Sequence, residues 1–283
     1  MTAEKPLRHV WLCADDYGIS PGVNRAIRDL IERQRINATS VMVVGAAIER
    51  SEVDALKSVL EANSNCAVGL HATLTAPFAP LTLHFKPLRD GQFLPLSNLL
   101  IKSMMRSLDV EIVQAELIAQ IAAFRELFGR PPDYLDGHQH VQLFPIIRDA
   151  FLDAVKNAAP DAWVRQCGRA TSLAQRIKQP KALLLDTLSA AFRQKCRASG
   201  IEFNPAFSGA YDFAATNDFG TLMRDFLAEL PDGGLAMCHP GFVDDTLLAL
   251  DPLTHQRERE YKFLSSNDFA IMMNESGLTL ARD

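Results

Sequence analysis

The sequence contains few cysteines, and their spacing forms no recognisable pattern. Five cysteines are scattered over 283 residues, and no two of them form a Cys-x-x-Cys pair. An odd number of separated cysteines argues against a disulfide framework, and the missing pair argues against a structural zinc site. We therefore expect the protein to work in a reducing compartment, and the cytoplasm fits best.

Long apolar runs and clusters of basic charge are also missing. No stretch approaches the length of about 18 apolar residues that a membrane span needs, and the N-terminal residues lack the apolar region of a signal peptide. The net charge is −5, and acidic and basic residues are interspersed. The sequence therefore predicts no membrane insertion, no export, no nucleic-acid partner and no anionic membrane surface as a partner.

The sequence does contain enough apolar residues for a large core, at 48% hydrophobic content. Short β-rich runs alternate with helical patterns, which is typical of a parallel sheet or barrel. The runs that we interpret as strands are HVWLCA (9–14), TSVMVV (39–44), AVGLHA (67–72), YLDGHQH (134–140), AWVRQC (162–167) and GLAMCHP (234–240). We expect an α/β fold with the strands in this alternating arrangement.

Two of the predicted helices have clear starting signals, and a third helix follows them. Ser20 is the expected cap of a helix whose first residue is a proline and whose apolar residues recur with a helical period. Asp109 opens a longer helix, which we expect to stop at Gly129 because a Pro-Pro breaker follows. A third helix is predicted from Pro145 onward.

Two segments do not fit this alternation. Residues 76–108 are rich in proline and leucine, and residues 168–215 contain a basic amphipathic stretch followed by FNPAFSGAYDF. We interpret both as insertions over the mouth of a site or as interface elements. The sequence has no internal repeat, so we predict a single domain over residues 1–283 that carries these two insertions.

Polar residues end five of the predicted strands, where an α/β sheet or barrel gathers its functional groups. They are Asp15, Asp16, His71, Asp136, His138, His140, Arg165 and His239. One carboxylate with two imidazoles is a ligand set for a divalent transition metal with open positions, although a purely structural polar layer is the alternative. A metal would explain the adjacent Asp15 and Asp16, because one can bind the cation while the other accepts a proton from metal-bound water.

His138 and His140 are two residues apart. In an extended strand their side chains would point to the same face, so both could reach the site. The spacing alone leaves open whether one or both bind metal.

Several segments resemble the YdjC family, also called the ChbG/HpnK carbohydrate deacetylases. The matching motifs are ADDYG with SPGVNRAI just after it, TSVMV, GLHATL, FGRPPDYLDGHQHVQLFP and MCHPGF, in the order of the family. The resemblance implies a distorted (β/α) barrel similar to polysaccharide deacetylases. It also implies that acetyl groups are removed from N-acetylated sugars with the help of a divalent metal.

The same resemblance implies roles for individual residues. Asp16, His71 and His138 resemble the family's metal ligands, and Asp15 resembles its general base. His239 resembles the histidine that protonates the leaving group.

Three more positions follow from the resemblance. Arg165 resembles the arginine that orients the base, and His140 would lie behind the ligands or face the substrate. Tyr17 stands where phenylalanine is common in the family, and we expect its additional hydroxyl to lie near the mouth and contact the substrate.

The sequence only partly determines which metal ion and which partner the protein binds. One aspartate and two histidines are suitable ligands for zinc or another transition ion, whereas magnesium binds imidazole ligands less readily. The expected partner is a small carbohydrate, whose identity stays open, and a homodimer is compatible with the sequence without being specified by it.

Another metal-dependent hydrolase, such as a phosphoesterase, is the first alternative function, although no phosphate-binding loop accompanies the motifs. A non-catalytic sugar-binding protein of the same fold is the second alternative.

Overall fold

The computed structural model describes residues 7–169, 180–213 and 218–281. The strands are β1 (Arg8–Tyr17), β2 (Ala38–Val41), β3 (Ala67–Ala72), β4 (Tyr134–Gly137), β5 (Trp163–Val164), β6 (Phe207–Ser208), β7 (Leu235–Cys238) and β8 (Leu278–Leu280). The helices are α1 (Pro21–Glu32), α2 (Arg50–Ala62), α3 (Leu96–Met104), α4 (Val110–Phe128), α5 (Ile147–Ala158), α7 (Pro180–Ser199), α8 (Phe219–Ala228), α9 (Asp245–Leu250), α10 (His255–Leu264) and α11 (Asn267–Glu275), and His138–Leu143 form the 3-10 helix η1.

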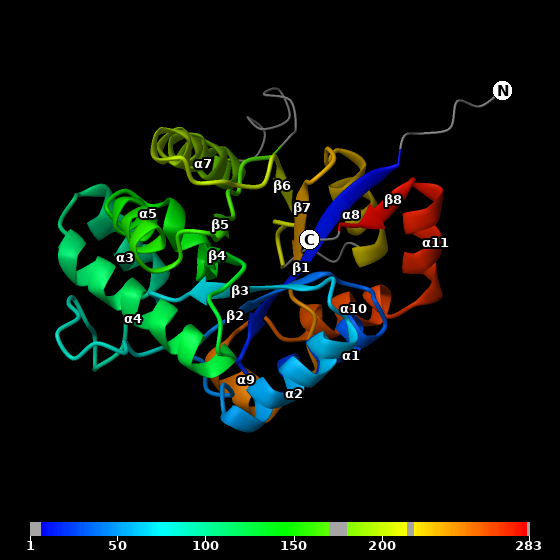
Figure 1. Cartoon of the computed structure of the whole chain (residues 1–283), viewed down its shortest axis with the longest axis horizontal. Helices are drawn as coiled ribbons and strands as arrows, with labels where there is room; N and C mark the ends of the chain where they lie inside the picture. The colour runs from blue at the N-terminus through cyan, green and yellow to red at the C-terminus, as the bar shows by residue number, and fades with distance from the viewer. Residues whose placement is uncertain (1–6, 170–179, 214–217, 282–283) are drawn as a thin grey trace.

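The strands form one parallel sheet, in which β1 pairs with β2, β7 and β8 (Figure 1). Their order is β5-β4-β3-β2-β1-β7-β6, and β8 pairs with the start of β1. In the shared register, Cys13 of β1 lies opposite Ala38 of β2 and Met237 of β7. The middle of β1 is therefore enclosed on both sides, which explains why its residues Leu12 and Cys13 are fully buried.

Backbone hydrogen bonds join the two edges of this sheet. The N–H of Val164 donates to the carbonyl of Glu202 at 2.9 Å, and the N–H of Phe207 donates to the carbonyl of Gly168 at 3.1 Å. With these contacts the strands β1 to β7 follow one another round a ring in chain order. The α/β fold, a distorted (β/α) barrel, is thus confirmed, and the distortion is greatest where β5 and β6 are only two residues long.

The predicted helix starts agree with the local structure. The Oγ of Ser20 accepts a hydrogen bond from the first turn of α1, and Asp109 caps α4 in the same way. Gly129 ends α4 in the left-handed region, with φ 72°. The third helix, α5, begins at Ile147, two residues later than the sequence predicts.

The predicted strand over 134–140 is too long. β4 ends at Gly137, and the chain turns at once into η1, where Gln139 and His140 adopt positive φ angles of 55° and 60°. A Cβ on Gly137 would lie 2.7 Å from the side-chain oxygen of Gln142, so glycine permits this tight turn. His138 and His140 therefore do not share the face of a strand, and that prediction is wrong.

The two predicted insertions contain different structures. Segment 76–108 runs through a loop into α3, and Glu116 of α4 accepts hydrogen bonds from the backbone of Leu81 and Thr82. Segment 168–215 contains α7 and β6, while residues 170–179 and 214–215 lie outside the described residues. The organisation as one domain with two insertions stays a prediction.

None of the described helices is long and apolar enough to span a membrane. The expectations about the cytoplasm, nucleic acid and a homodimer stay predictions.

Candidate metal centre

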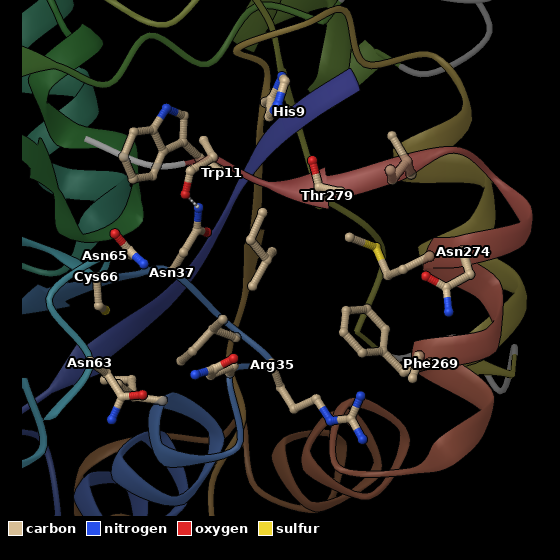
Figure 2. A pocket seen from close by; sticks show the side chains of 18 of the residues that line it. His9, Trp11, Arg35, Asn37, Asn63, Asn65, Cys66, Phe269, Asn274 and Thr279 are labelled. Atoms are coloured by element: carbon tan, nitrogen blue, oxygen red, sulfur yellow. Dashed lines mark hydrogen bonds between the residues drawn. The ribbon is translucent and has the colours of Figure 1, made fainter. Parts of the chain in front are cut away.

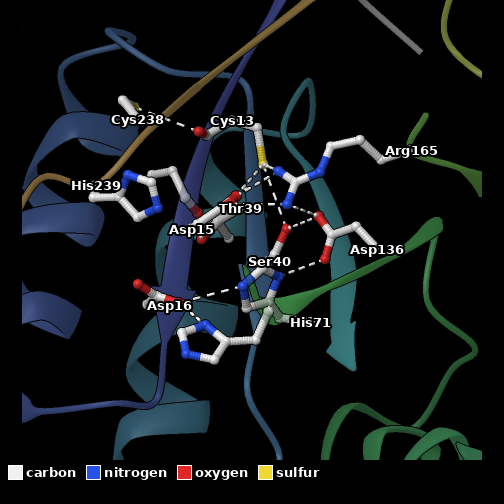
Figure 3. A network of polar contacts seen from close by, with 12 residues as sticks. Cys13, Asp15, Asp16, Thr39, Ser40, His71, Asp136, Arg165, Cys238 and His239 are labelled. Carbon is white, nitrogen blue, oxygen red and sulfur yellow. Dashed lines mark hydrogen bonds and ion pairs between the residues drawn. The ribbon is translucent and has the colours of Figure 1, made fainter. Parts of the chain in front are cut away.

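Asp16, His71 and His138 meet at the carboxyl ends of β1, β3 and β4, with β2 lying between β1 and β3 in the sheet. Oδ1 of Asp16 lies 3.0 Å from Nδ1 of His138 and 3.3 Å from Nε2 of His71. All three residues are buried, and each offers one ligand atom within 4.8 Å of the others. Figure 3 shows Asp16 of β1 and His71 of β3 facing each other in this cluster. The structure thus brings together the three residues that the resemblance implied.

An irregularity in β1 lets two consecutive aspartates reach the same region. Neighbouring side chains of a regular strand point to opposite faces. Between Ala14 and Tyr17, however, the pairing of β1 with β2 shifts register, and Asp16 has a left-handed φ of 72°. Such a bulge redirects a side chain at a cost of about 1–3 kcal/mol. Asp15 and Asp16 can therefore both point into the barrel.

Asp136 sets the orientation of His71. Its Oδ1 lies 2.5 Å from Nδ1 of His71, and because a carboxylate accepts, Nδ1 carries the proton. Nε2 is therefore the nitrogen that faces Asp16, and it is the one that would give up its proton to bind a cation. Ser40 donates to the other oxygen of Asp136 at 2.5 Å. In the sequence, Asp136 stands at the end of a predicted strand without an assigned role, and its only signal is its position before His138.

Arg257 of α10 is part of the cluster, and sequence reasoning missed it. Its Nη2 donates to Oδ2 of Asp16 and to Oδ2 of Asp251, both at 2.6 Å. The side chain is fully buried. No sequence pattern pointed to this position, because Arg257 lies within the charged run QRERE, which is typical of an exposed helix.

Asp15 forms a two-point ion pair with Arg165. The two terminal nitrogens of Arg165 donate to the two oxygens of Asp15 at 2.7 and 2.8 Å, and Nη2 also lies 3.0 Å from Asp136. Burial raises the pKa of Asp15, but the Arg165 charge outweighs it and holds that pKa well below its usual range. Asp15 is therefore ionised at neutral pH.

The charges of this cluster fit a divalent cation. The ion-paired groups are the carboxylates of Asp15, Asp16, Asp136 and Asp251 and the guanidiniums of Arg165 and Arg257. With neutral imidazoles, the four carboxylates exceed the two guanidiniums by two negative charges. Burial lowers the pKa of His71, but Asp136 and Asp15 outweigh this effect and raise it to about 10. In the metal-free protein His71 therefore carries a proton that offsets one of the two negative charges, and a bound cation would replace that proton. The donor set and the charge excess both suit a transition dication.

His239 lies beside this cluster. It follows β7, its side chain is half-buried, and Figure 3 shows its ring next to Asp15. The backbone N–H of His239 donates to Glu260 at 2.5 Å, and the ring packs edge-on against Phe213 at 5.5 Å. Its Nδ1 is buried and has no hydrogen-bond partner among the described residues. None of the described residues therefore engages this nitrogen of His239.

His140 is turned away from the ligand group. Its Nδ1 lies 3.5 Å from Sγ of Cys167, and its ring packs edge-on against Phe207. Burial, with the Arg165 charge, lowers the pKa of His140 to about 3, so the ring is neutral. Among the described residues, two groups of side chains could hold a cation, Asp16 with His71 and His138, and Cys13 with Asp15 and Asp136, and His140 belongs to neither.

Tyr17 does not face the cluster. It is fully buried, and its hydroxyl donates to the carbonyl of Glu52 at 2.6 Å and accepts from Arg28 at 2.7 Å. These partners belong to α2 and α1, which cover the outside of the barrel. The expected contact of Tyr17 with substrate is therefore corrected to a contact between helices.

A separate groove of about 1030 Å³ opens at the amino ends of the strands (Figure 2). Its lining includes His9, Trp11, Arg35 and Thr279, and none of the clustered site residues. The groove therefore lies at the opposite end of the barrel from the candidate metal centre.

Known proteins show where this chain belongs. A chitooligosaccharide deacetylase of Citrobacter koseri is 27% identical over 270 residues, which cover 94% of both chains. A human carbohydrate deacetylase is 30% identical over 156 residues, which cover 54% of this chain and 46% of the human protein. A solved Enterococcus faecalis structure, provisionally described as a cellobiose-phosphate cleavage protein, shares the fold with a TM-score of 0.71 at 20% identity, covering 98% of this chain and 97% of that chain. The family model described as "YdjC-like protein" matches residues 9–275, and this chain therefore belongs to the YdjC-like family.

Proposed function

We propose that this protein is a metal-dependent deacetylase that hydrolyses the acetamide of an N-acetylated sugar. The observation that carries the proposal is the group of Asp16, His71 and His138 with the ionised Asp15 beside it. The relatives named carbohydrate and chitooligosaccharide deacetylases support the class of substrate.

Asp16, His71 and His138 are the residues that would hold the cation. When bound, a divalent ion polarises a carbonyl oxygen and lowers the pKa of a bound water. The imidazole ligands favour zinc or another transition ion over magnesium. Because Nδ1 of His71 donates to Asp136, Nε2 is the nitrogen that would lose its proton and bind the cation.

Asp15 is the proposed general base. Arg165 keeps it ionised, and a carboxylate has about four acceptor sites, so two hydrogen bonds from Arg165 leave room for a proton from water. The same ion pair makes Asp15 a weak base, because it favours the charged form. Asp15 would therefore hold the proton only briefly. Arg165 would fix the orientation in which the Asp15 carboxylate accepts the proton from water.

His239 is the proposed acid for the departing amine. An amide nitrogen leaves poorly unless it is protonated, and a positioned acid typically contributes about 100- to 10,000-fold to such a step. The ring is half-buried beside Asp15, and Phe213 packs against it and limits its rotation. His140 would lie further from the reacting amide, as a neutral ring at the edge of the substrate site.

The direct test is acetate release from a panel of N-acetylated sugars. Protein stripped of metal by a chelator is reloaded with zinc, cobalt, manganese or magnesium, and acetate is measured for each ion. We expect no release without metal and the highest release with a transition ion. A parallel panel of phosphate esters serves as a control. Phosphate release without acetate release, or sugar binding without hydrolysis, would contradict the proposal.

A further inference from the structure

Arg257 holds the oxygen of Asp16 that does not face the imidazoles. Oδ1 of Asp16 lies next to His71 and His138, whereas Oδ2 accepts from Nη2 of Arg257 at 2.6 Å. The two oxygens of this one carboxylate thus have separate partners. Arg257 comes from α10, 241 residues further along the chain, so only the closed barrel creates the contact.

The guanidinium is itself held in place from several sides. Its Nε donates to the carbonyl of Leu253 at 3.0 Å, and Nη2 also donates to Asp251 at 2.6 Å. Gly241 packs against the aliphatic part of Arg257, where even a methyl group would come within 3.3 Å of Cβ and Cδ. A fully buried side chain with these contacts cannot easily follow Asp16 if the carboxylate turns.

This arrangement limits how Asp16 can bind a cation. A carboxylate may offer one oxygen or two, and a second oxygen would occupy a coordination position that water or substrate needs. Oδ2 could reach the cation only by giving up a charge-assisted hydrogen bond with Arg257, which is among the stronger contacts in proteins. The left-handed backbone at Asp16 also restricts the orientations of its side chain.

We propose that Arg257 is a positioning residue that restricts Asp16 to a single metal-ligating oxygen and thereby keeps a coordination position open. The inference rests on the proposed function, because it assumes that Asp16, His71 and His138 bind a cation. Neutralising the carboxylates of the buried Asp16 and the half-buried Asp251 is the simpler role for Arg257. That role alone would leave the coordination of the metal unchanged when Arg257 is replaced.

The test uses cobalt as the metal, because its visible absorption reports the number of ligands without any measurement of activity. The variants are Arg257→Met, which removes the charge, and Arg257→Lys, which keeps the charge but loses the planar fork. Asp251→Asn is the matched control, since it removes the other carboxylate on Nη2 and leaves the contact with Asp16.

We expect the cobalt bands of Arg257→Met to weaken and shift to shorter wavelength as Oδ2 joins the ion, and those of Arg257→Lys to change less in the same direction. Cobalt binding should not weaken, because removing a nearby positive charge favours the cation. With the native metal, kcat should fall about 10- to 100-fold in Arg257→Met, with little change in KM. Asp251→Asn should keep the cobalt spectrum of the unmodified protein.

Unchanged cobalt spectra in both Arg257 variants would overturn the proposal. If Arg257→Met does not fold, as far-ultraviolet circular dichroism would show, the spectrum of Arg257→Lys decides alone. The proposed function is tested by a different result. If the unmodified protein binds neither cobalt nor zinc, it has no metal centre, and the proposed function is contradicted whatever the role of Arg257.

Discussion

The carboxylate of Asp136 accepts the Nδ1 proton of His71 at 2.5 Å, and this contact determines which nitrogen of His71 faces Asp16. Ser40 and Arg165 hold the second oxygen of Asp136 at 2.5 and 3.0 Å. Asp136, which lies outside the group of Asp16, His71 and His138, therefore controls the orientation of one of the proposed ligands. It also joins the cation site to the ion pair of the proposed base.

Replacing Asp136 should weaken metal binding. In Asp136→Asn the neutral amide binds Nδ1 less strongly and no longer pairs with Arg165, so we expect zinc affinity to fall about 10- to 100-fold. Equilibrium dialysis with zinc measures this change. Ser40→Ala is the control, because it removes one contact of Asp136 and keeps the contact with His71. Equal affinities of Asp136→Asn and the unmodified protein would contradict the orienting role.

The two neighbouring aspartates should separate activity from metal binding. Asp15→Asn keeps the ligand group intact, so we expect full metal content and acetate release lowered by about 100- to 10,000-fold. Asp16→Asn removes a ligand and should lose both. Metal analysis after gel filtration and an acetate assay make the comparison. If Asp15→Asn kept full activity, Asp15 would not be the base.

His138 and His140 form a second matched pair. Because His138 faces Asp16 and His140 faces Cys167, His138→Ala should lose bound metal and His140→Ala should keep it. Isothermal titration with zinc distinguishes the two variants. Loss of metal from both would mean that His140 joins the ligands, against the geometry.

His239→Ala should impair amide hydrolysis more than ester hydrolysis. An amine needs a proton to leave, whereas the alcohol of an activated acetyl ester leaves readily. We expect a loss of about 100-fold or more on an N-acetyl sugar and a smaller loss on the ester. Equal losses on both substrates would argue against His239 as the leaving-group acid.

The metal-free protein should become less stable as the pH rises. His71 has a folded pKa of about 10, above its ordinary value of 6.5, so its charged form stabilises the fold. This contribution is fully present below pH 6.5 and is lost as the pH rises through about 10. Thermal unfolding of metal-free protein across this interval should show a falling Tm, and His71→Gln should show a flatter profile. A Tm of the metal-free protein that does not fall over this interval would contradict a charged His71.

Much of the architecture was predictable from local chemistry. The caps at Ser20 and Asp109 and the stop at Gly129 depend on neighbouring residues in the chain, so the sequence alone is sufficient to locate them. The parallel alternation likewise predicts that carboxyl ends of strands gather, which is why Asp16 and His71 could be expected at one site.

Contacts between distant parts of the chain were decided only by the tertiary structure. The turn after Gly137 separates His138 from His140, and the packing of α1 and α2 buries the hydroxyl of Tyr17. The contact of Arg257 with Asp16 spans 241 residues. Periodicity and caps describe how a segment folds with its neighbours, whereas the partner of a buried charge depends on how the whole barrel closes.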